Sequence, residues 1–167
     1  METIYFNGTE CHTAGNIPAA WSEAPRFTLV TPTLEEVTND TYKGKRIVLN
    51  IFPSLDTEVC AMSVRHFNQA AAELDNTVVL AVSMDLPFAA GRFCTTHEIK
   101  NVTPASAFRH PEFIKNYGLE IIDGPLKGLL ARAVIIIDEE GKISYRELVN
   151  EITHEPDYAA ALRSLKK

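Results

Sequence analysis

The sequence predicts an α/β fold with a mixed central sheet, helices on both faces of the sheet and a β-hairpin at the N-terminus. Short apolar, β-branched runs alternate with amphipathic segments, which favours parallel strands joined by crossover helices. The last two strand-like runs instead flank Glu139-Glu140-Gly141, a hairpin connection that adds antiparallel strands. A chain of 167 residues is the size of one domain, so we expect residues 1–167 to form a single domain.

The first part of the chain contains short strands. Residues 3–6 alternate polar and apolar side chains, and the Asn-Gly pair that follows is a hairpin turn signal. Residues 10–13 are therefore expected to form the return strand. Residues 27–30 are expected to be another short strand, and residues 37–43 a turn of helix.

The middle of the chain alternates buried strands with helices. Residues 47–52 and 77–83 are nearly continuous apolar runs, as expected for central strands buried on both faces. Apolar side chains recur at helical spacing over residues 61–73. Residues 87–97 begin with a proline, which favours the first turn of a helix, and residues 101–104 form a short strand.

The last part of the chain completes the sheet and covers it. Residues 111–117 are predicted to form a helix that Gly118 closes. Residues 133–138 and 142–148 form the strands of the hairpin, and residues 156–165 the last helix. A mixed sheet with helices on both faces fits a thioredoxin-like sandwich. Active sites in such sheets lie beyond the carboxyl ends of strands.

Composition and charge argue against several classes of protein. The apolar fraction of 46% and the charged fraction of 23% are ordinary for a globular protein, and the net charge of −6 argues against nucleic acid or an anionic membrane as the main partner. No apolar run approaches the ~20 residues that span a bilayer. The first residues lack the basic and apolar stretches of a signal peptide, so we expect a cytoplasmic protein.

The three cysteines, Cys11, Cys60 and Cys94, are too few for a disulfide scaffold, and their number is odd. In a reducing compartment they are expected to be reduced, catalytic or redox-active. There is no Cys-x-x-Cys, and the pair Cys94-x-x-His97 alone is a weak signal, so we expect neither a metal site nor a cofactor.

The stretch 53–60 (PSLDTEVC), between a predicted strand and a predicted helix, is the most informative. Pro53 ends the strand, and Asp56 and Thr57 are good N-cap residues. Cys60 therefore falls in the first turn of the helix, where the dipole favours the reactive thiolate. The dipole supplies about 0.3–2 kcal/mol, whereas lowering the pKa of a thiol by ~2–3 units needs ~3–4 kcal/mol. A cationic donor must supply the difference.

Arg132 is the best candidate for that cation. It stands at the start of the apolar run 133–138, where a charged residue is unusual because Arg is rarely buried without a partner. The alternative is a solvated arginine at a strand end. Glu58 carries the wrong sign for stabilising a thiolate, although an exposed carboxylate should have an effect of ~1 kcal/mol or less. The alternative for Cys60 is a buried cysteine that acts as a small apolar residue.

Several motifs together resemble the thiol peroxidase branch of the peroxiredoxins, from about residue 24 to the C-terminus. They are the stretches NIFPSLDT (50–57), VCAMSVR (59–65), RFC (92–94), GPLKGLLARA (124–133) and EPDY (155–158). The chain departs from the family pattern in several places, which include the extra Cys11 and the divergent stretch 18–22. Glu58 stands where a non-acidic residue is usual, and residues 95–97 (TTH) stand where a Gly-containing stretch is more common.

The resemblance implies a homodimeric, thiol-dependent peroxidase that reduces hydrogen peroxide and alkyl hydroperoxides. It implies that Cys60 is the peroxidatic nucleophile, which becomes a sulfenic acid, and that Cys94 resolves it as an intrachain disulfide. Thioredoxin would then reduce this disulfide. Pro53 and Thr57 would shield and orient the peroxide, and Arg132 would activate both the thiolate and the peroxide.

Two other classes of function remain open. A protein dithiol–disulfide oxidoreductase or redox relay would use Cys60 and Cys94 but pass oxidation to proteins. A binding module without catalysis would keep its function in a Cys60→Ser variant. Cys94 could also be an inert packing cysteine, and Cys11 is expected to be a bystander. If Cys60 and Cys94 do form a bridge, local rearrangement is expected, because both lie in predicted helices and a disulfide needs Cα atoms within ~7 Å.

Overall fold

The computed structural model describes residues 1–166 and confirms the mixed α/β architecture. The N-terminal hairpin consists of β1 (Thr3–Phe6) and β2 (Thr9–His12). The other strands are β3 (Thr28–Val30), β4 (Glu36–Thr38), β5 (Arg46–Ile51), β6 (Thr77–Ser83), β7 (Thr103–Ser106), β8 (Ala133–Ile137) and β9 (Ile143–Leu148). The helices are α1 (Glu58–Ala71), α2 (Pro87–Thr96), α3 (Pro111–Tyr117) and α4 (Tyr158–Ser164), with a 3-10 turn η1 at Asn39–Tyr42.

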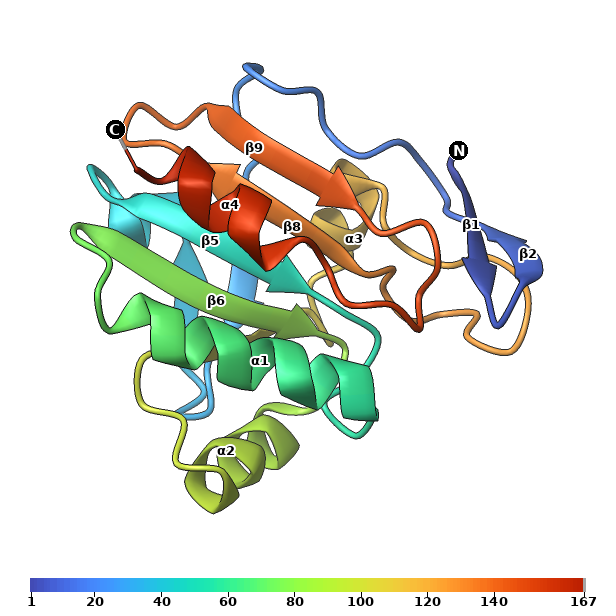
Figure 1. The fold of residues 1–167 in the computed structure, drawn as a ribbon, viewed down its shortest axis with the longest axis horizontal. Helices are drawn as coiled ribbons and strands as arrows, with labels where there is room; N and C mark the ends of the chain where they lie inside the picture. Colours follow the sequence, from blue (N-terminus) through green and yellow to red (C-terminus); the bar gives the residue numbers. More distant parts are fainter. Residues whose placement is uncertain (167) are drawn as a thin grey trace.

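The seven strands after the hairpin form one sheet in the order β4-β3-β7-β6-β5-β8-β9 (Figure 1). Strands β5, β6 and β7 are parallel, as the alternation of strands and helices predicts. Strand β8 runs antiparallel to β5, with Ile51 paired to Ala133. The carboxyl end of β5 therefore lies beside the amino end of β8, which brings the residues after Ile51 close to those before Ala133.

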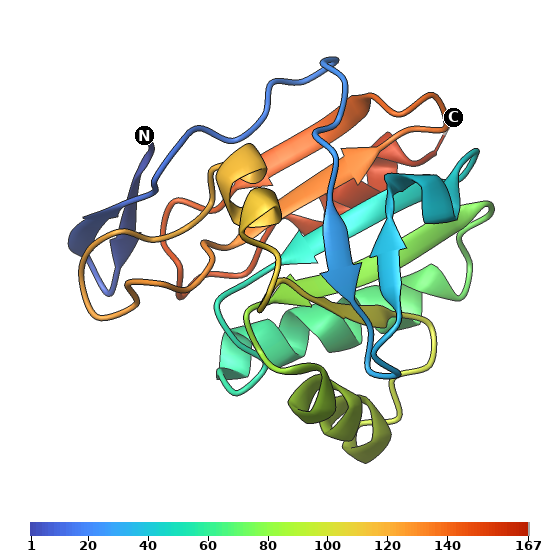
Figure 2. The same cartoon turned by 180° about the vertical axis from the view of Figure 1, so that it is seen from behind.

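Helices cover both faces of the sheet. Figure 1 shows α1 and α4 on one face, with α2 beside α1, and Figure 2 shows α3 on the other. The side chains of β5 alternate accordingly: Val48 belongs to the same buried cluster as Phe67 of α1, and Leu49 to the same cluster as Phe113 of α3. The central strand is thus buried on both sides, as its apolar run predicts.

Most elements begin and end within two residues of their predicted bounds, and three differences are informative. Residues 37–43 were expected to form only a helical turn, and β4 precedes that turn because it pairs antiparallel with β3. Strand β7 is shifted by two residues, to Thr103–Ser106 from the predicted 101–104. The expected end was Pro104, which has no backbone N–H. Since β3 pairs with β7 only at Ser106, the proline removes no hydrogen bond between these two strands. Helix α1 begins at Glu58 rather than residue 61.

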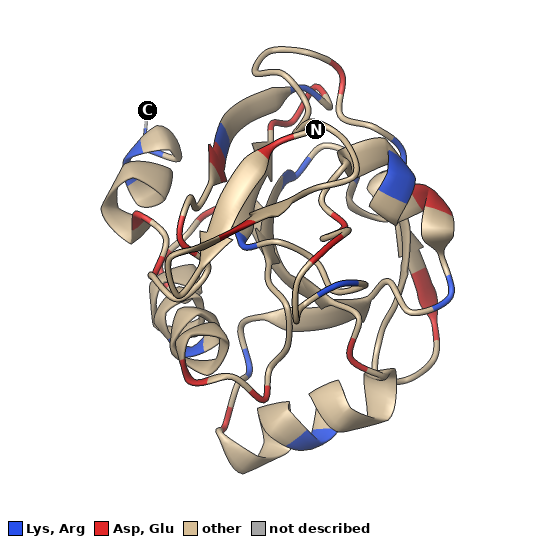
Figure 3. Cartoon of the chain, turned by 90° about the vertical axis from the view of Figure 1, so that its right-hand side faces the viewer, with Lys and Arg blue, Asp and Glu red and all other residues tan. Residues whose placement is uncertain are grey.

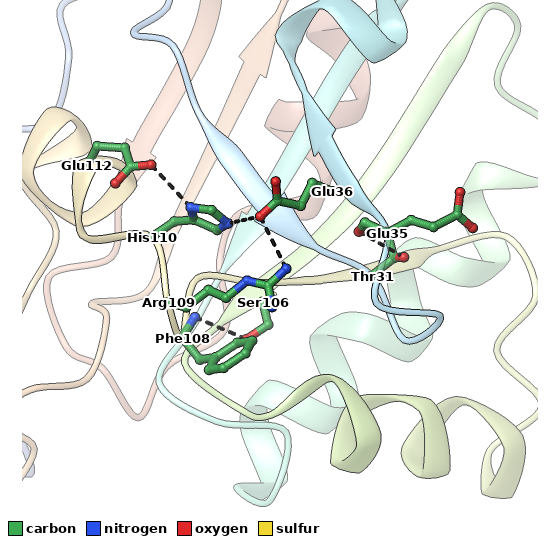
Figure 4. Close-up of polar contacts among 8 residues, drawn as sticks. All are labelled: Thr31, Glu35, Glu36, Ser106, Phe108, Arg109, His110 and Glu112. Carbon is green, nitrogen blue, oxygen red and sulfur yellow. Dashed lines mark hydrogen bonds and ion pairs between the residues drawn. The ribbon is translucent and has the colours of Figure 1, made fainter.

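The edge strand β4 is tied to the segment before α3 by a polar cluster (Figure 4). Glu36 Oε2 accepts a hydrogen bond from Arg109 Nη2 at 3.2 Å and lies 2.6 Å from His110 Nε2. The hydrogen bond with His110 is the main cause that holds the pKa of Glu36 below its ordinary value. In the strand order this cluster belongs to the edge of the sheet opposite β9.

Charged residues of both signs are interspersed along the chain in the view of Figure 3, without a continuous basic stripe. None of the helices within residues 1–166 has the length and apolar character needed to cross a membrane.

Candidate active site

Cys60 lies at the junction between β5 and α1. It is the third residue of the helix, so the prediction that it occupies a first helical turn after a strand is confirmed. Its side chain is buried. Thr57 is the N-cap residue, with the extended backbone that this position requires (φ −100°, ψ 146°).

The Thr57 hydroxyl does not cap the helix. It donates instead to the carbonyl oxygen of Ser54 at 3.1 Å, one turn back along the loop. The hydroxyl oxygen keeps its capacity to accept a hydrogen bond from a bound molecule. The expected role of Thr57 in orienting a peroxide beside Cys60 stays a prediction.

Arg132 is buried with 2% of its surface exposed, so the alternative of a solvated arginine at the strand end is wrong. Its Nη2 donates to Cys60 Sγ at 3.2 Å, and its Nε donates to the carbonyl oxygen of Ile152 at 2.7 Å. Within the described residues Nη1 is buried and has no hydrogen-bond partner. A guanidinium only donates, so its contact with sulfur favours the thiolate form.

A narrow cleft of about 240 Å³ lies at this site and contains three of the predicted site residues. Pro53, Thr57 and Arg132 are on its wall, and most of the remaining lining is apolar. The other lining residues are Phe6, Glu58, Val59, Leu126, Leu129, Ile152 and Thr153. A larger cleft of about 560 Å³, near Gly15 and α3, contains none of the predicted site residues, so volume alone does not locate the chemistry. Cys60 itself lines neither cleft, because its side chain is fully buried against Arg132.

Cys94 lies outside this cleft, near the end of α2, where it lines a separate hollow with Thr95 and Ile99. It is half-buried, and burial raises the pKa of its thiol to about 11. Cys11 is buried in β2, where burial raises the pKa of its thiol, assisted by the negative charges of nearby carboxylates. All three cysteines are free thiols in this structure.

Two groups that support the Cys60 junction were not singled out from the sequence. Ser63 Oγ donates to the carbonyl oxygen of Cys60 at 2.8 Å and accepts a hydrogen bond from Asn50 Nδ2 at 3.1 Å, with both side chains buried. The signal was available, because Asn50 is a polar residue inside a strand that is otherwise apolar. Asp85, which follows β6, holds the loop before α1. Its carboxylate accepts hydrogen bonds from Ser54 Oγ at 2.8 Å and from the backbone N–H of Leu55 at 2.7 Å.

Tyr158, in the EPDY motif, packs the start of α4 against α1. Its ring stacks on His66 with a centroid distance of 3.9 Å and meets Phe67 edge-on at 5.4 Å. Its hydroxyl donates to Glu155 at 2.9 Å, and burial is the main cause that raises the pKa of the phenol. This stack covers the helix that carries Cys60.

The arrangement suits a specific kind of chemistry. A buried sulfur lies beside a fixed cation that has one donor free, at an apolar cleft. Such a site favours attack by sulfur on a small uncharged electrophile whose departing atom gains negative charge. Within residues 1–166 no group of three or more His, Cys, Asp or Glu side chains is placed to hold a metal ion.

Comparison with known proteins reveals extensive similarity. A model of the redoxin family matches residues 19–162. A thiol peroxidase of Corynebacterium glutamicum is 53% identical over 165 residues, which cover 99% of each chain. A thiol peroxidase of Vibrio cholerae serotype O1 is 48% identical over 163 residues, which cover 98% of this chain and 99% of the relative.

Solved structures show the same similarity. A peroxiredoxin-like protein from Aquifex aeolicus superposes with a TM-score of 0.94 at 42% identity, covering 99% of this chain and 96% of that one. A thiol peroxidase from Chromobacterium violaceum superposes with a TM-score of 0.90, covering 98% of this chain and 95% of that one. Its identity of 19% makes it evidence for the fold alone.

Proposed function

The chain belongs to the redoxin family of thiol-dependent peroxidases, and we propose that Cys60 is its peroxidatic nucleophile. One observation carries this proposal: Arg132 Nη2 lies 3.2 Å from the Cys60 sulfur in a buried site, while Nη1 of the same guanidinium is free. The first nitrogen stabilises the thiolate. The second is available to the peroxide, where charge develops as the O–O bond breaks.

In the first step the Cys60 thiolate attacks one oxygen of the peroxide. A sulfur–oxygen bond forms as the O–O bond breaks, and the electron pair of that bond moves to the departing oxygen. This oxygen takes up a proton and leaves as water or as an alcohol, and Cys60 becomes a sulfenic acid. Arg132 stays charged throughout, because a guanidinium is not deprotonated in proteins.

Thr57 and Pro53 hold the peroxide in this step. The Thr57 hydroxyl gives its hydrogen to the Ser54 carbonyl, so its oxygen is oriented to accept a hydrogen bond from the peroxide O–H. Pro53 is buried on the wall of the cleft and has no N–H of its own to compete for the peroxide. It therefore shields the sulfur from water.

Cys94 resolves the sulfenic acid in the second step. Its sulfur attacks Sγ of Cys60, an S–S bond forms, and the sulfenic oxygen leaves as water with a proton from the Cys94 thiol. Cys94 sits on a different helix and outside the cleft, so α2 must unwind locally before the two sulfurs meet. Thioredoxin then reduces the intrachain disulfide by thiol–disulfide exchange.

The cleft supports two substrate classes. It is large enough for hydrogen peroxide, and its apolar wall of Leu126, Leu129 and Val59 also favours the hydrocarbon part of an alkyl hydroperoxide. The need for a thioredoxin-type reductant places the enzyme in a reducing compartment, the cytoplasm. We further propose that the chain acts as one domain and as a homodimer, as the family resemblance implies.

Peroxide turnover with thioredoxin as the reductant tests this function. The wild type is expected to consume hydrogen peroxide and cumene hydroperoxide, whereas Cys60→Ser consumes neither. A redox relay is the alternative, and it would oxidise a thiol protein partner with little turnover of free peroxide. Unchanged turnover by Cys60→Ser would exclude Cys60 as the nucleophile, and a binding module without catalysis would show no turnover by the wild type.

A further inference from the structure

We propose that Glu151 is a positioning residue for the peroxidase reaction, because it fastens the N-terminal hairpin to the backbone that holds Arg132. The inference rests on the roles proposed above for Cys60 and Arg132. It assigns a function to the β1–β2 hairpin, which lies outside the seven-stranded sheet.

The Glu151 carboxylate accepts four hydrogen bonds. Oε1 accepts from the backbone N–H of Gly8 at 2.8 Å, and Oε2 accepts from the backbone N–H of Asn7 at 3.2 Å. Oε2 also accepts from the backbone N–H and the hydroxyl of Thr153, at 3.0 Å and 2.8 Å. The two hairpin donors belong to a turn whose residues both have positive φ, 52° at Asn7 and 81° at Gly8. This conformation turns both amides toward the carboxylate.

The backbone on either side of Glu151 forms a single parallel bridge with β1, between Tyr5 and Glu151. The N–H of Tyr5 donates to the carbonyl of Asn150 at 2.8 Å, and the N–H of Ile152 donates to the carbonyl of Tyr5 at 2.9 Å. Figure 1 shows the hairpin beside the segment between β9 and α4. The Glu151 carboxylate thus bonds the turn of the hairpin on one side of this backbone contact and Thr153 on the other.

This contact reaches the reacting atoms through Ile152. The carbonyl oxygen of Ile152, whose N–H is bonded to Tyr5, accepts from Arg132 Nε at 2.7 Å. Nε and the two terminal nitrogens of a guanidinium are coplanar, so fixing Nε fixes the direction of Nη2 toward the sulfur of Cys60. A shift of the segment around Glu151 therefore rotates the donor away from the thiolate.

The same contact shapes the cleft. Phe6 at the end of β1 and Thr153 after Glu151 both line it. The Glu151 carboxylate accepts hydrogen bonds from Asn7, which follows Phe6, and from Thr153. It therefore sets the distance between these two walls of the cleft. The hairpin is then part of the site for a large hydroperoxide as well as a support for the arginine.

The test compares Glu151→Gln with a matched control, Glu36→Gln. Glutamine is nearly isosteric, but its amide nitrogen cannot accept the hydrogen bonds that one carboxylate oxygen receives. Glu36 is also a well-bonded carboxylate, but it lies in the polar cluster of β4, at the sheet edge opposite β9 (Figure 4). The readout is stopped-flow oxidation of reduced protein by hydrogen peroxide and by cumene hydroperoxide, as a function of pH.

Glu151→Gln is expected to lower the rate constant for both peroxides on the order of 10- to 100-fold, as displaced catalytic groups do. The profile of the rate constant against pH should change as well, because the contact between Arg132 and the Cys60 sulfur is altered. Glu36→Gln should keep the wild-type rates and pH profile. Wild-type rates and profile in Glu151→Gln, or the same change in both variants, would overturn the inference.

A milder pair covers the case in which Glu151→Gln does not fold. Thr153→Val removes one of the four donors, and Thr153→Ser keeps it. A smaller loss of rate in the valine variant with recovery in the serine variant supports the inference, and equal rates in the two variants contradict it. Cys60→Ser, assayed in parallel, separates the claims: if it retains turnover, the proposed nucleophile is wrong, whatever the Glu151 result.

Discussion

Arg132 illustrates how one residue organises the site. The three nitrogen atoms of its guanidinium have different surroundings. Nε donates to the Ile152 carbonyl, Nη2 contacts the Cys60 sulfur, and Nη1 is buried without a hydrogen-bond partner among the described residues. A buried donor left unpaired costs about 1–3 kcal/mol, so its retention here is consistent with use by a substrate. The three N–H groups of a lysine share one nitrogen atom, so a lysine cannot reproduce the planar spread of donors over these three positions.

Replacing Arg132 by lysine is accordingly expected to slow oxidation of Cys60 by hydrogen peroxide on the order of 100-fold, the usual loss when a donor to developing charge is removed. Stopped-flow kinetics under pseudo-first-order conditions measure the rate constant, and circular dichroism checks that the variant is folded. A folded Arg132→Lys protein with the wild-type rate constant would show that the guanidinium is dispensable.

Cys94 differs from Cys60 in its surroundings. Burial raises the pKa of Cys94 from 9.0 to about 11, so in this conformation its thiol is protonated at neutral pH. Below pH 9 the thiol is protonated in both the folded and the unfolded chain, so its burial costs no stability. The folded state loses stability as pH rises from 9 toward 11, because over this range the thiol ionises in the unfolded chain first. Burial therefore keeps the Cys94 thiol in its less reactive, protonated form at neutral pH.

We expect iodoacetamide to modify Cys94 slowly in the native reduced protein at pH 8, and the rate to rise until the pH reaches about 11. In urea-unfolded protein the same rise should be complete nearer pH 9. Peptide mapping by mass spectrometry gives the rate at each cysteine separately. Coincident pH profiles in the folded and unfolded states would contradict this account of its environment.

At the scale of elements, α2 has few local features that stabilise a helix. Its N-cap, Leu86, provides no side-chain hydrogen bond, and the helix has no acidic residue in its first turn or basic residue in its last. Gly91 stands in its middle, which costs about 1 kcal/mol relative to alanine, and the Thr95 hydroxyl bonds back to the Gly91 carbonyl. The helix is held mainly by tertiary contacts such as that of Ala90.

Hydrogen exchange is therefore expected to be faster in α2 than in α1 in the reduced protein, because α2 is shorter, 10 residues against 14, and contains a glycine in its middle. After oxidation with peroxide, protection in the second half of α2 should be lost, while β5 and β6 keep theirs. Unchanged protection in α2 of a protein shown to contain the Cys60–Cys94 bridge would mean that another segment moves.

The elements also show what a sequence can predict. Residues 77–83 and 111–117 have the predicted bounds, because an apolar run and a proline–glycine pair are local signals. Strand β4 was not predicted, since its three residues become a strand only by pairing with β3. The Cys60–Arg132 contact could be predicted from two unusual local features, a cysteine in the first turn of a helix and an arginine at the start of an apolar strand. The acceptor at Ile152 is a backbone carbonyl and has no signature in the sequence.

At the scale of the whole molecule, the sheet brings together residues distant in sequence. The antiparallel pairing of β5 and β8 places Cys60 and Arg132 at one end of the sheet, 72 positions apart in the chain. The N-terminal hairpin then closes that end through Glu151, which is 143 positions from Gly8. A few carboxylates thus join segments that are distant in the sequence.

Acid should weaken these links. Hydrogen bonds, foremost from the Thr153 backbone, lower the pKa of Glu151 from 4.5 to about 2, and a hydrogen bond with His12 lowers the pKa of Asp123. A depressed folded-state pKa gives stability that is present above the unfolded value and lost as pH falls. The thermal midpoint should therefore drop between pH 4.5 and pH 2, and less steeply in Glu151→Gln. Parallel curves for the two proteins would contradict this assignment.

The central claim is that Cys60 reacts with peroxide and that Cys94 resolves it within the same chain. Mass spectrometry of the reduced protein after one equivalent of hydrogen peroxide tests both parts. The account predicts an intrachain Cys60–Cys94 disulfide in the wild type, a dimedone-trapped sulfenic acid at Cys60 in Cys94→Ser, and no reaction in Cys60→Ser. A Cys60–Cys11 link, an interchain dimer under non-reducing conditions, or oxidation of Cys60→Ser at the wild-type rate would contradict it.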